Sequence, residues 1–237
     1  YQEDFTLIGT TDQEHTHADV APTCTDEEAQ YLCDFASNYF KKPVTMDDIV
    51  WRYSGVRPLY DDGASSAQAA TRDYVLKLDD GGAPVLNIFG GKITTYRKLA
   101  EAAMEKLTPF FPAATAPWTA GVAMPGGDFE VHQVGDKIAE LQRDYPFLTD
   151  AWAKRLIRAY GTEAPEMLGA AKSASDLGAD FGATLTAAEV DWLMTKEYAR
   201  AAADVVWRRS KLGLRLSEQQ IATIDSYMTT ARQKASA

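Results

Sequence analysis

The stretch TPFFPAATAPWTAGVAMPGGD, residues 108–128, holds four prolines and three glycines. Proline lacks a backbone donor and glycine is conformationally permissive, so neither a regular helix nor a central strand can run through such a segment. It therefore predicts a division of the chain into two regions that fold separately. We expect a first domain over residues 1–112, a linker over residues 113–127, and a second domain over residues 128–237.

The region before this linker mixes strand and helix patterns. Thr25 followed by Glu28 is a capping box, in which each side chain accepts a hydrogen bond from the other residue's backbone amide, so it predicts a helix start. The turn sequence Asp79-Asp80-Gly81-Gly82 between two apolar runs predicts a β-hairpin. The expected elements are a strand at 5–10, a helix at 25–39, a strand at 50–56, hairpin strands at 72–78 and 84–89, and a helix at 92–107.

The region after the linker has helical periodicity almost throughout. Apolar residues recur at intervals of three and four, and Gly161 is expected to end one helix as a left-handed cap. Thr186 with Glu189 predicts a second capping box, opening a long helix with Tyr198 and Val205 facing inward. On the outer face of that helix we expect an ion pair between Asp204 and Arg208. The two patterns together predict a mixed α+β chain that ends in an all-α domain. The residues expected to face the helical core are Val131, Val134, Ile138, Leu141, Trp152, Leu156, Tyr160, Val190, Leu193, Met194, Ala201, Ile221, Ile224 and Met228.

Composition excludes several classes of protein. The net charge of −10 argues against a nucleic-acid-binding protein, which needs a basic face to neutralise phosphates. The sequence has no run of eighteen apolar residues, so no membrane-spanning helix is expected. It opens with Tyr1-Gln2 and without a signal peptide, which suggests an internal cut. Cys24 and Cys33 have neither redox nor zinc spacing, and the histidines near the start complete no ligand set, so no metal site is expected.

The sequence NIFGGKITTYRKLAE, residues 87–101, passes from an apolar strand through Gly90-Gly91-Lys92 into a helix. The two glycines allow a ligand to approach the backbone, and the unpaired amides and dipole at a helix start favour negative charge. A phosphate loop of the Walker type is excluded, because Leu86 stands where its first glycine belongs. The alternative is a plain strand-to-helix turn without a ligand, and the motif alone leaves both readings open.

Three arginines lie in or beside the expected strands of the first region, namely Arg52, Arg57 and Arg72. Arg57 stands between a valine and a proline, so it must pair with a carboxylate or with a ligand anion. Asp61 and Asp62 are the nearby candidates for an internal ion pair, and this alternative stays open. In the helical region, a solvated surface position is expected for Arg155, Arg158, Arg208 and Arg209.

Several stretches of this sequence together resemble one enzyme family. WRYSGVRPLYDDG, TRDYVLKLD and IFGGKITTYRKLAE are similar to successive signature stretches of FAD-dependent glycerol-3-phosphate dehydrogenase, the aerobic enzyme of the respiratory chain. LTAAEVDWLMTKEYARAAADVVWRRSKLGL resembles the C-terminal helical domain of that family. No glycine-rich G-x-G-x-x-G motif occurs in the 237 residues. The resemblance therefore implies the C-terminal part of such an enzyme: the remainder of an α/β domain that binds FAD and substrate, followed by the all-α domain.

The resemblance also implies a site. Six residues would lie against the isoalloxazine ring of FAD, and Arg57, Arg72 and Lys92 would act at the substrate, glycerol 3-phosphate, which is oxidised to dihydroxyacetone phosphate. The electrons would pass to quinone, on a homodimer bound peripherally to the inner, cytoplasmic face of the cytoplasmic membrane. The alternatives are an oxidase that passes electrons to oxygen, and a helical module that docks a partner or the membrane. The six residues at the ring are Gly90, Gly91, Lys92, Ile93, Thr94 and Thr95.

Overall fold

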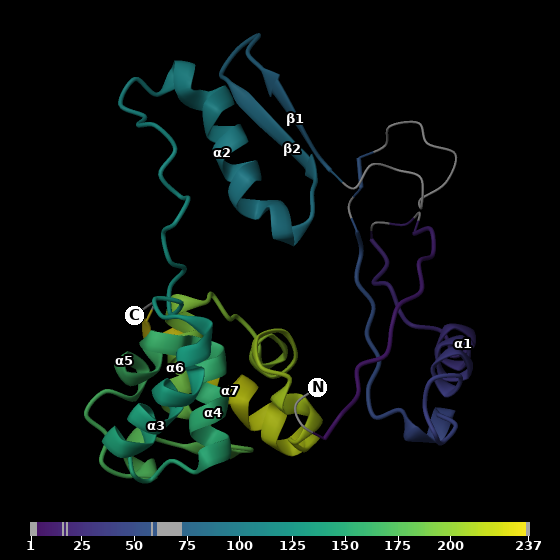
Figure 1. Ribbon diagram of the computed structural model, residues 1–237, viewed down its shortest axis with the longest axis vertical. Helices are drawn as coiled ribbons and strands as arrows, with labels where there is room; N and C mark the ends of the chain where they lie inside the picture. Colours follow the sequence, from purple (N-terminus) through teal and green to yellow (C-terminus); the bar gives the residue numbers. More distant parts are fainter. Residues whose placement is uncertain (1–3, 16, 18, 58, 61–72, 236–237) are drawn as a thin grey trace. The chain divides into compact units, whose positions relative to one another are not determined.

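The chain divides into two compact units, Tyr1–Gly121 and Val122–Ala237. The computed structural model (Figure 1) describes residues 4–15, 17, 19–57, 59–60 and 73–235. The division falls inside the proline- and glycine-rich segment, where the sequence changes from one pattern to the other. The three domain limits expected from the sequence remain a prediction.

The first unit begins with loops and the helix α1 (Asp26–Ser37). Its predicted capping box is confirmed: the Glu28 amide donates to Thr25 Oγ1 over 3.2 Å, and the Thr25 amide donates to Glu28 Oε2 over 3.0 Å. A 3-10 turn, η1 (Met46–Asp48), follows. The strands expected at 5–10 and 50–56 are wrong, because the described part of these segments is irregular. A strand needs a hydrogen-bonding neighbour, and within the described residues the two sheets contain only other segments.

The predicted hairpin is confirmed as β1 (Tyr74–Asp79) and β2 (Val85–Gly90). The strands are antiparallel, and the Asp79 side chain accepts from the Gly81 amide over 3.1 Å at the turn. Beyond β2 the chain enters a 3-10 turn, η2 (Ile93–Thr95), and then the helix α2 (Tyr96–Leu107), which packs along the hairpin (Figure 1). The short turn η3 (Thr108–Phe110) ends this part.

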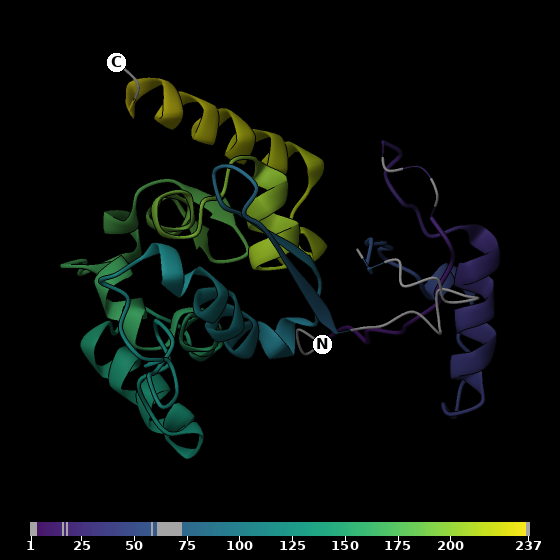
Figure 2. The same ribbon diagram turned by 90° about the horizontal axis from the view of Figure 1, so that it is seen from above.

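The second unit surrounds one core of 26 buried residues. Its helix α7 (Glu218–Ala235), the yellow helix that leads to the C-terminus in Figure 2, is 18 residues long. It packs against β3 and α6. A short antiparallel hairpin, β3 with β4, lies among the helices, so the unit is mostly helical but not all-α as expected. The bounds are η4 (Val131–Gln133), α3 (Val134–Asp144), α4 (Asp150–Tyr160), η5 (Gly161–Glu163), α5 (Ala164–Leu168), η6 (Ala174–Leu177), β3 (Asp180–Gly182), β4 (Leu185–Thr186), α6 (Ala187–Lys196), the π-helix η7 (Asp204–Arg209), η8 (Leu212–Leu214) and α7 (Glu218–Ala235).

The long helix predicted to start at Thr186 is shorter than expected. It ends at Lys196, and Tyr198 adopts a positive φ of 57° with 77% of its surface exposed rather than facing inward. The Thr186 side chain makes no capping hydrogen bond. Val205 is fully buried, as predicted, but it belongs to the separate π-helix. The chain turns at residue 198, so the apolar residues predicted for this stretch cannot lie along one face of a single continuous helix.

Gly161 ends α4, as predicted, with a positive φ of 53°, but its ψ of −124° is not that of the left-handed cap expected there. This position also touches the backbone of Gly126 so closely that a Cβ on Gly161 would lie 1.8 Å from the Gly126 carbonyl oxygen. The same oxygen accepts from the Thr162 amide over 3.0 Å. The final residues of the linker are therefore fastened to the end of α4 and belong to the helical unit.

Candidate functional site

The Gly-Gly-Lys turn lies directly at the end of β2. Gly90 and Gly91 have positive φ angles of 68° and 97°, a conformation that side chains of other residues disfavour. A Cβ on Gly91 would also lie 3.3 Å from Tyr74 Cβ, which is tighter than ordinary contact. Glycine is therefore required here by both the backbone angle and the packing of the hairpin.

The residues after the two glycines are open to a ligand. Lys92, Ile93 and Thr94 are exposed, Ile93 to 86%. The first amides of this turn have no acceptor within the helix, as at any helix start. Thr95 is different, because its amide and hydroxyl both donate to the Lys92 carbonyl oxygen, over 3.0 and 2.8 Å. The turn thus offers one ammonium group and two backbone amides on one exposed edge.

Arg57 has an internal partner among the described residues, Asp12. Its guanidinium forms an ion pair with Asp12 over 3.0 Å, and both side chains are substantially exposed, at 49% and 39%. Asp61, Asp62 and the predicted site residue Arg72 lie outside the described residues. An exposed ion pair of this kind contributes little stability and exchanges readily with another anion.

Arg52 forms a similar pair with Asp26 over 2.5 Å. The hydrogen bond to Asp26 raises the pKa of Arg52. This contact ties the segment before Arg57 to the first turn of α1, so Arg52 has a structural partner and is not needed for a ligand.

A contact that the sequence did not predict links the segment containing Arg57 and Tyr60 to the β1–β2 hairpin. Lys77 Nζ donates to Tyr60 Oη over 2.5 Å, and the ring centroids of Tyr60 and Phe89 lie 5.5 Å apart. Lys77 Nζ also lies 4.8 Å from the centroid of the Tyr60 ring. No local sequence pattern predicts a contact between residues so far apart in the chain.

The expectation that Arg155 lies on a solvated surface is wrong. It forms a two-pronged ion pair with Glu189, at 2.6 and 2.7 Å, and donates to the Thr184 carbonyl oxygen over 2.9 Å. Tyr160 Oη donates to the same carboxylate over 2.7 Å, and burial, followed by the Glu189 charge, raises the pKa of Tyr160. All these groups are saturated by each other, which indicates a structural network of the core and not a reactive centre.

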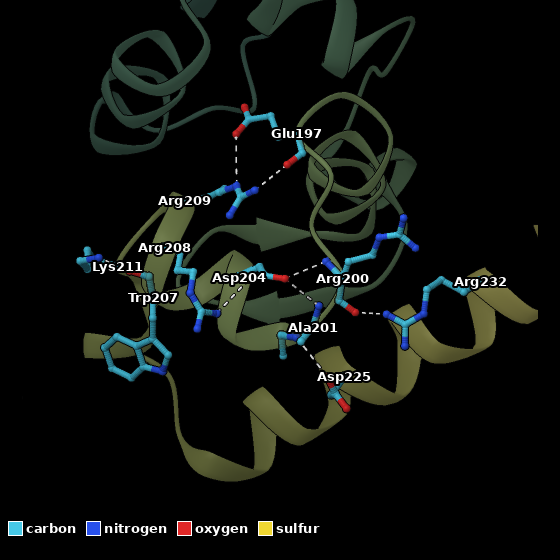
Figure 3. Close-up of polar contacts among 11 residues, drawn as sticks. Glu197, Arg200, Ala201, Asp204, Trp207, Arg208, Arg209, Lys211, Asp225 and Arg232 are labelled. Carbon is cyan, nitrogen blue, oxygen red and sulfur yellow. Dashed lines mark hydrogen bonds and ion pairs between the residues drawn. The ribbon is translucent and has the colours of Figure 1, made fainter. Parts of the chain in front are cut away.

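The π-helix is held by Asp204 (Figure 3). Its carboxylate accepts from the Arg200 and Ala201 amides, over 2.8 and 3.0 Å, and pairs with Arg208 over 2.8 Å, so the predicted Asp204–Arg208 pair is confirmed. The Arg200 amide, with smaller contributions from Ala201 and Arg208, lowers the pKa of Asp204. Of the four arginines expected at the surface of this unit, three are exposed as predicted: Arg158, Arg208 and Arg209.

Two kinds of site receive no support in the described part of the chain. No cluster of three or more histidine, cysteine or carboxylate side chains that could hold a metal ion is found there. Nor does any helix there have the length and hydropathy needed to cross a membrane.

Comparison with known proteins identifies both units. The model of the C-terminal domain of alpha-glycerophosphate oxidase matches residues 117–235, about half of the chain, and the FAD dependent oxidoreductase model matches residues 1–97. The chain belongs to the FAD-dependent oxidoreductases that carry this C-terminal domain. The residues that the two family models match follow one another along the chain in the same order as the two structural units.

Curated relatives resemble this chain along almost its whole length. The aerobic glycerol-3-phosphate dehydrogenase of Escherichia coli is 44% identical over 236 residues, 99% of this chain and 47% of the relative. Glycerol-3-phosphate dehydrogenase of Pseudomonas aeruginosa is 41% identical over 230 residues, 96% and 45% of the two chains. D-erythritol 1-phosphate dehydrogenase of Brucella abortus is 38% identical over 234 residues, 98% and 46%. The chain spans just under half the length of these relatives, and the family resemblance stated from the sequence is confirmed.

The residues of the turn fit the flavin that this oxidoreductase family uses. A planar ring needs a backbone surface free of side chains, and Gly90 and Gly91 could supply one. Negative charge on that ring needs nearby donors, and Lys92 and the backbone amides of Ile93 and Thr94 could supply them. The assignment of individual residues to the cofactor and substrate stays a prediction.

Proposed function

We propose that the full-length protein containing this chain is an FAD-dependent sn-glycerol-3-phosphate dehydrogenase that produces dihydroxyacetone phosphate. The observation that carries this proposal is the 44% identity to the aerobic glycerol-3-phosphate dehydrogenase of Escherichia coli over 99% of the chain. The exposed Gly-Gly-Lys turn supports it independently, because its geometry suits a flat, electron-accepting ring.

The turn residues would hold the flavin and favour its negative charge. Bound FAD would supply the two-electron acceptor for oxidation of the substrate's C2 hydroxyl. Gly90 and Gly91 would contact the ring face, and the amides of Ile93 and Thr94 would donate toward its electron-rich edge. Lys92 would add a full positive charge at the same edge, and Thr95 would keep the turn in shape through its bonds to the Lys92 carbonyl oxygen.

Arg57 and Arg72 would bind the substrate, and at least one of them would take its phosphate. Arginine suits this role because its planar fork of donors matches the oxygens of a phosphate. The exposed pair of Arg57 with Asp12 supports the idea, since a dianionic phosphate competes well with a single solvated carboxylate. Asp12 would keep the guanidinium extended until substrate arrives.

Quinone is the proposed electron acceptor, with the enzyme bound as a homodimer to the inner face of the cytoplasmic membrane. The word "aerobic" in the name of the Escherichia coli relative supports a respiratory role. The matched domain is named after an oxidase, which supports oxygen as the alternative acceptor. Reduction of a soluble quinone analogue, measured against formation of hydrogen peroxide in air, separates the two.

The substrate is tested on the purified full-length enzyme with glycerol 3-phosphate and D-erythritol 1-phosphate in parallel, because a 38% identical relative is named for the second compound. We expect kcat/KM to favour glycerol 3-phosphate. Higher kcat/KM for D-erythritol 1-phosphate would move the proposal to the longer substrate, and oxidation of neither would refute it.

The role of Arg57 is tested by Arg57→Met in the same enzyme. A charged hydrogen bond to phosphate is lost, so we expect KM to rise about tenfold or more. Arg143→Met is the matched control, because Arg143 is exposed and forms an ion pair with the adjacent Asp144. An unchanged KM in Arg57→Met would remove Arg57 from the substrate site.

Two truncations test which part of the enzyme is needed for FAD binding and turnover, and which for membrane association. The 237 residues alone contain no G-x-G-x-x-G motif, so we expect them neither to retain FAD through dialysis nor to oxidise glycerol 3-phosphate. Deleting residues 125–237 from the full-length enzyme tests the helical unit as a docking module. Retained turnover with lost membrane association would support that alternative.

A further inference from the structure

Tyr60 lies where three parts of the first unit meet. Its hydroxyl accepts from Lys77 on β1, its ring lies under the Lys77 ammonium at 4.8 Å, and it stacks at a tilt on Phe89 of β2. Tyr60 is half-buried, whereas Lys77 is exposed and Phe89 is 39% exposed. The tyrosine therefore uses its ring and its hydroxyl at once to attach to the hairpin.

The strand register explains why one side chain reaches both strands. Phe89 stands opposite Val75, and Lys77 stands opposite Asn87. Residues two apart on a strand share a face, so Lys77 and Phe89 form a diagonal pair on the same face of the hairpin. A long aromatic side chain laid across that diagonal touches both.

The residues on both sides of this contact lie close in sequence to the proposed substrate and cofactor residues. Arg57 is three residues before Tyr60, and Phe89 directly precedes Gly90 and the Gly-Gly-Lys turn. Asp12 holds Arg57 itself, and the Leu59 amide donates to the Arg57 carbonyl oxygen over 2.9 Å, which keeps this segment tightly turned. A displacement of Tyr60 would move Arg57 relative to the turn.

We propose that Tyr60 and Lys77 are positioning residues that set the place of Arg57 relative to the flavin-binding turn and so determine affinity for the substrate's phosphate. This inference rests on the proposed function. Neither residue touches the reacting atoms; each acts through Arg57. The Lys77 ammonium donates its hydrogen bond to Tyr60, and the Tyr60 ring packs on Phe89. These contacts together act as a brace, because they attach the segment that contains Arg57 and Tyr60 to β2.

The test uses the full-length holoenzyme with the variants Tyr60→Phe, Tyr60→Leu and Lys77→Met. Tyr60→Phe loses only the hydrogen bond from Lys77, whereas Tyr60→Leu loses the stacking on Phe89 as well. Tyr31→Phe is the matched control, because Tyr31 is an exposed tyrosine of α1 in the same unit. Binding of dihydroxyacetone phosphate to the oxidised enzyme is measured by calorimetry, and KM and kcat for glycerol 3-phosphate are measured alongside.

We expect Kd and KM to rise about three- to fivefold in Tyr60→Phe and Lys77→Met, and more in Tyr60→Leu, with kcat nearly unchanged. The effect of Tyr60→Phe should vanish when Arg57 is already methionine, because a positioning residue acts only through the group it positions. Tyr31→Phe should behave as the unchanged enzyme. Equal binding in all variants would overturn the proposal. So would an effect of Lys77→Met that persists without Arg57, since Lys77 would then bind the phosphate directly.

Hydrogen–deuterium exchange at the amides of Val56, Arg57, Leu59 and Tyr60 tests the brace without relying on substrate. These amides should exchange faster in Tyr60→Leu than in Tyr31→Phe, and unchanged exchange would refute the brace itself. Failure of the unmodified enzyme to bind dihydroxyacetone phosphate, together with faster exchange in Tyr60→Leu, would refute the proposed function and with it the phosphate role, while the brace would stand.

Discussion

The two units of this chain bury very different amounts of apolar surface. The helical unit contains 26 buried apolar residues in one core, whereas the described part of the first unit contains four, namely Ala29, Cys33, Ala36 and Ala103. The first unit carries 18 of the 22 large apolar side chains that are exposed in the described residues, and the helical unit carries four. Burial is the main favourable contribution to folding, so the two units differ in what holds them together.

The two units also differ in how deeply their arginine ion pairs are buried. In the first unit, Arg52 and Arg57 pair with carboxylates at exposed positions, where ion pairs contribute little to stability. In the helical unit, Arg155 pairs with Glu189 in the core, with side chains only 16% and 2% exposed. The proposed ligand-binding arginine is thus held loosely, whereas the arginine with a purely structural role is held tightly. A site that must exchange an internal carboxylate for a substrate benefits from the first arrangement.

The largest expected effect comes from separating the units. Residues 122–237, expressed alone, should unfold cooperatively, because they contain their own core. Residues 1–121, expressed alone, should show no cooperative thermal transition, since few apolar side chains are buried there. Circular dichroism during heating measures both. A sharp transition in residues 1–121 would contradict this comparison.

Next in size is the buried ion pair. Removing one partner, in Arg155→Met or Glu189→Leu, leaves a buried charge without its counterion and should lower the free energy of unfolding by about 3–5 kcal/mol. The double variant should lose less than either single variant, because no unpaired charge remains. Lys196→Met, which breaks the exposed pair with Glu166, is the control and should cost below about 1 kcal/mol. Urea unfolding gives these values, and additive losses in the double variant would contradict the explanation.

A smaller effect is expected at the glycine that fastens the linker to α4. Gly161→Ala adds a Cβ that meets the Gly126 carbonyl oxygen and should cost about 3 kcal/mol in unfolding free energy. Gly169→Ala is the matched control: its φ is also positive, at 57°, but an added Cβ meets nothing within 4 Å. The control has nearly the same backbone angles without the contact, so it should cost less, about 1–2 kcal/mol of backbone strain. Equal losses in thermal or urea unfolding would show that the contact with residue 126 is unimportant.

Local sequence patterns predicted the features whose partners are near in the chain. The capping box at Thr25, the β1–β2 hairpin and the helix end at Gly161 all depend on residues within a few positions of each other, and all are confirmed. The pair of Asp204 with Arg208 is of the same kind. The Gly-Gly-Lys turn was recognised from its local pattern in the same way, because strand, glycines and helix start are contiguous.

Patterns failed where a distant partner decides the outcome. Glu189 stands at the position of a capping-box carboxylate, yet it pairs with Arg155, 34 residues earlier, because a charge taken into the core needs a counterion. Residues 5–10 and 50–56 have the composition of strands, but the described part of the chain supplies no neighbouring strand for them.

The sequence by itself determined the family, the division near the linker and the turn that suits a flavin, since each is written in contiguous residues. Only the tertiary structure decided that Arg57 pairs with Asp12, that Tyr60 contacts the hairpin, and that Arg155 is internal. The physical reason is the same in each case. A side chain's electrostatic and packing energy depends on groups that folding brings near, and these groups lie 45, 17 and 34 residues away along the chain.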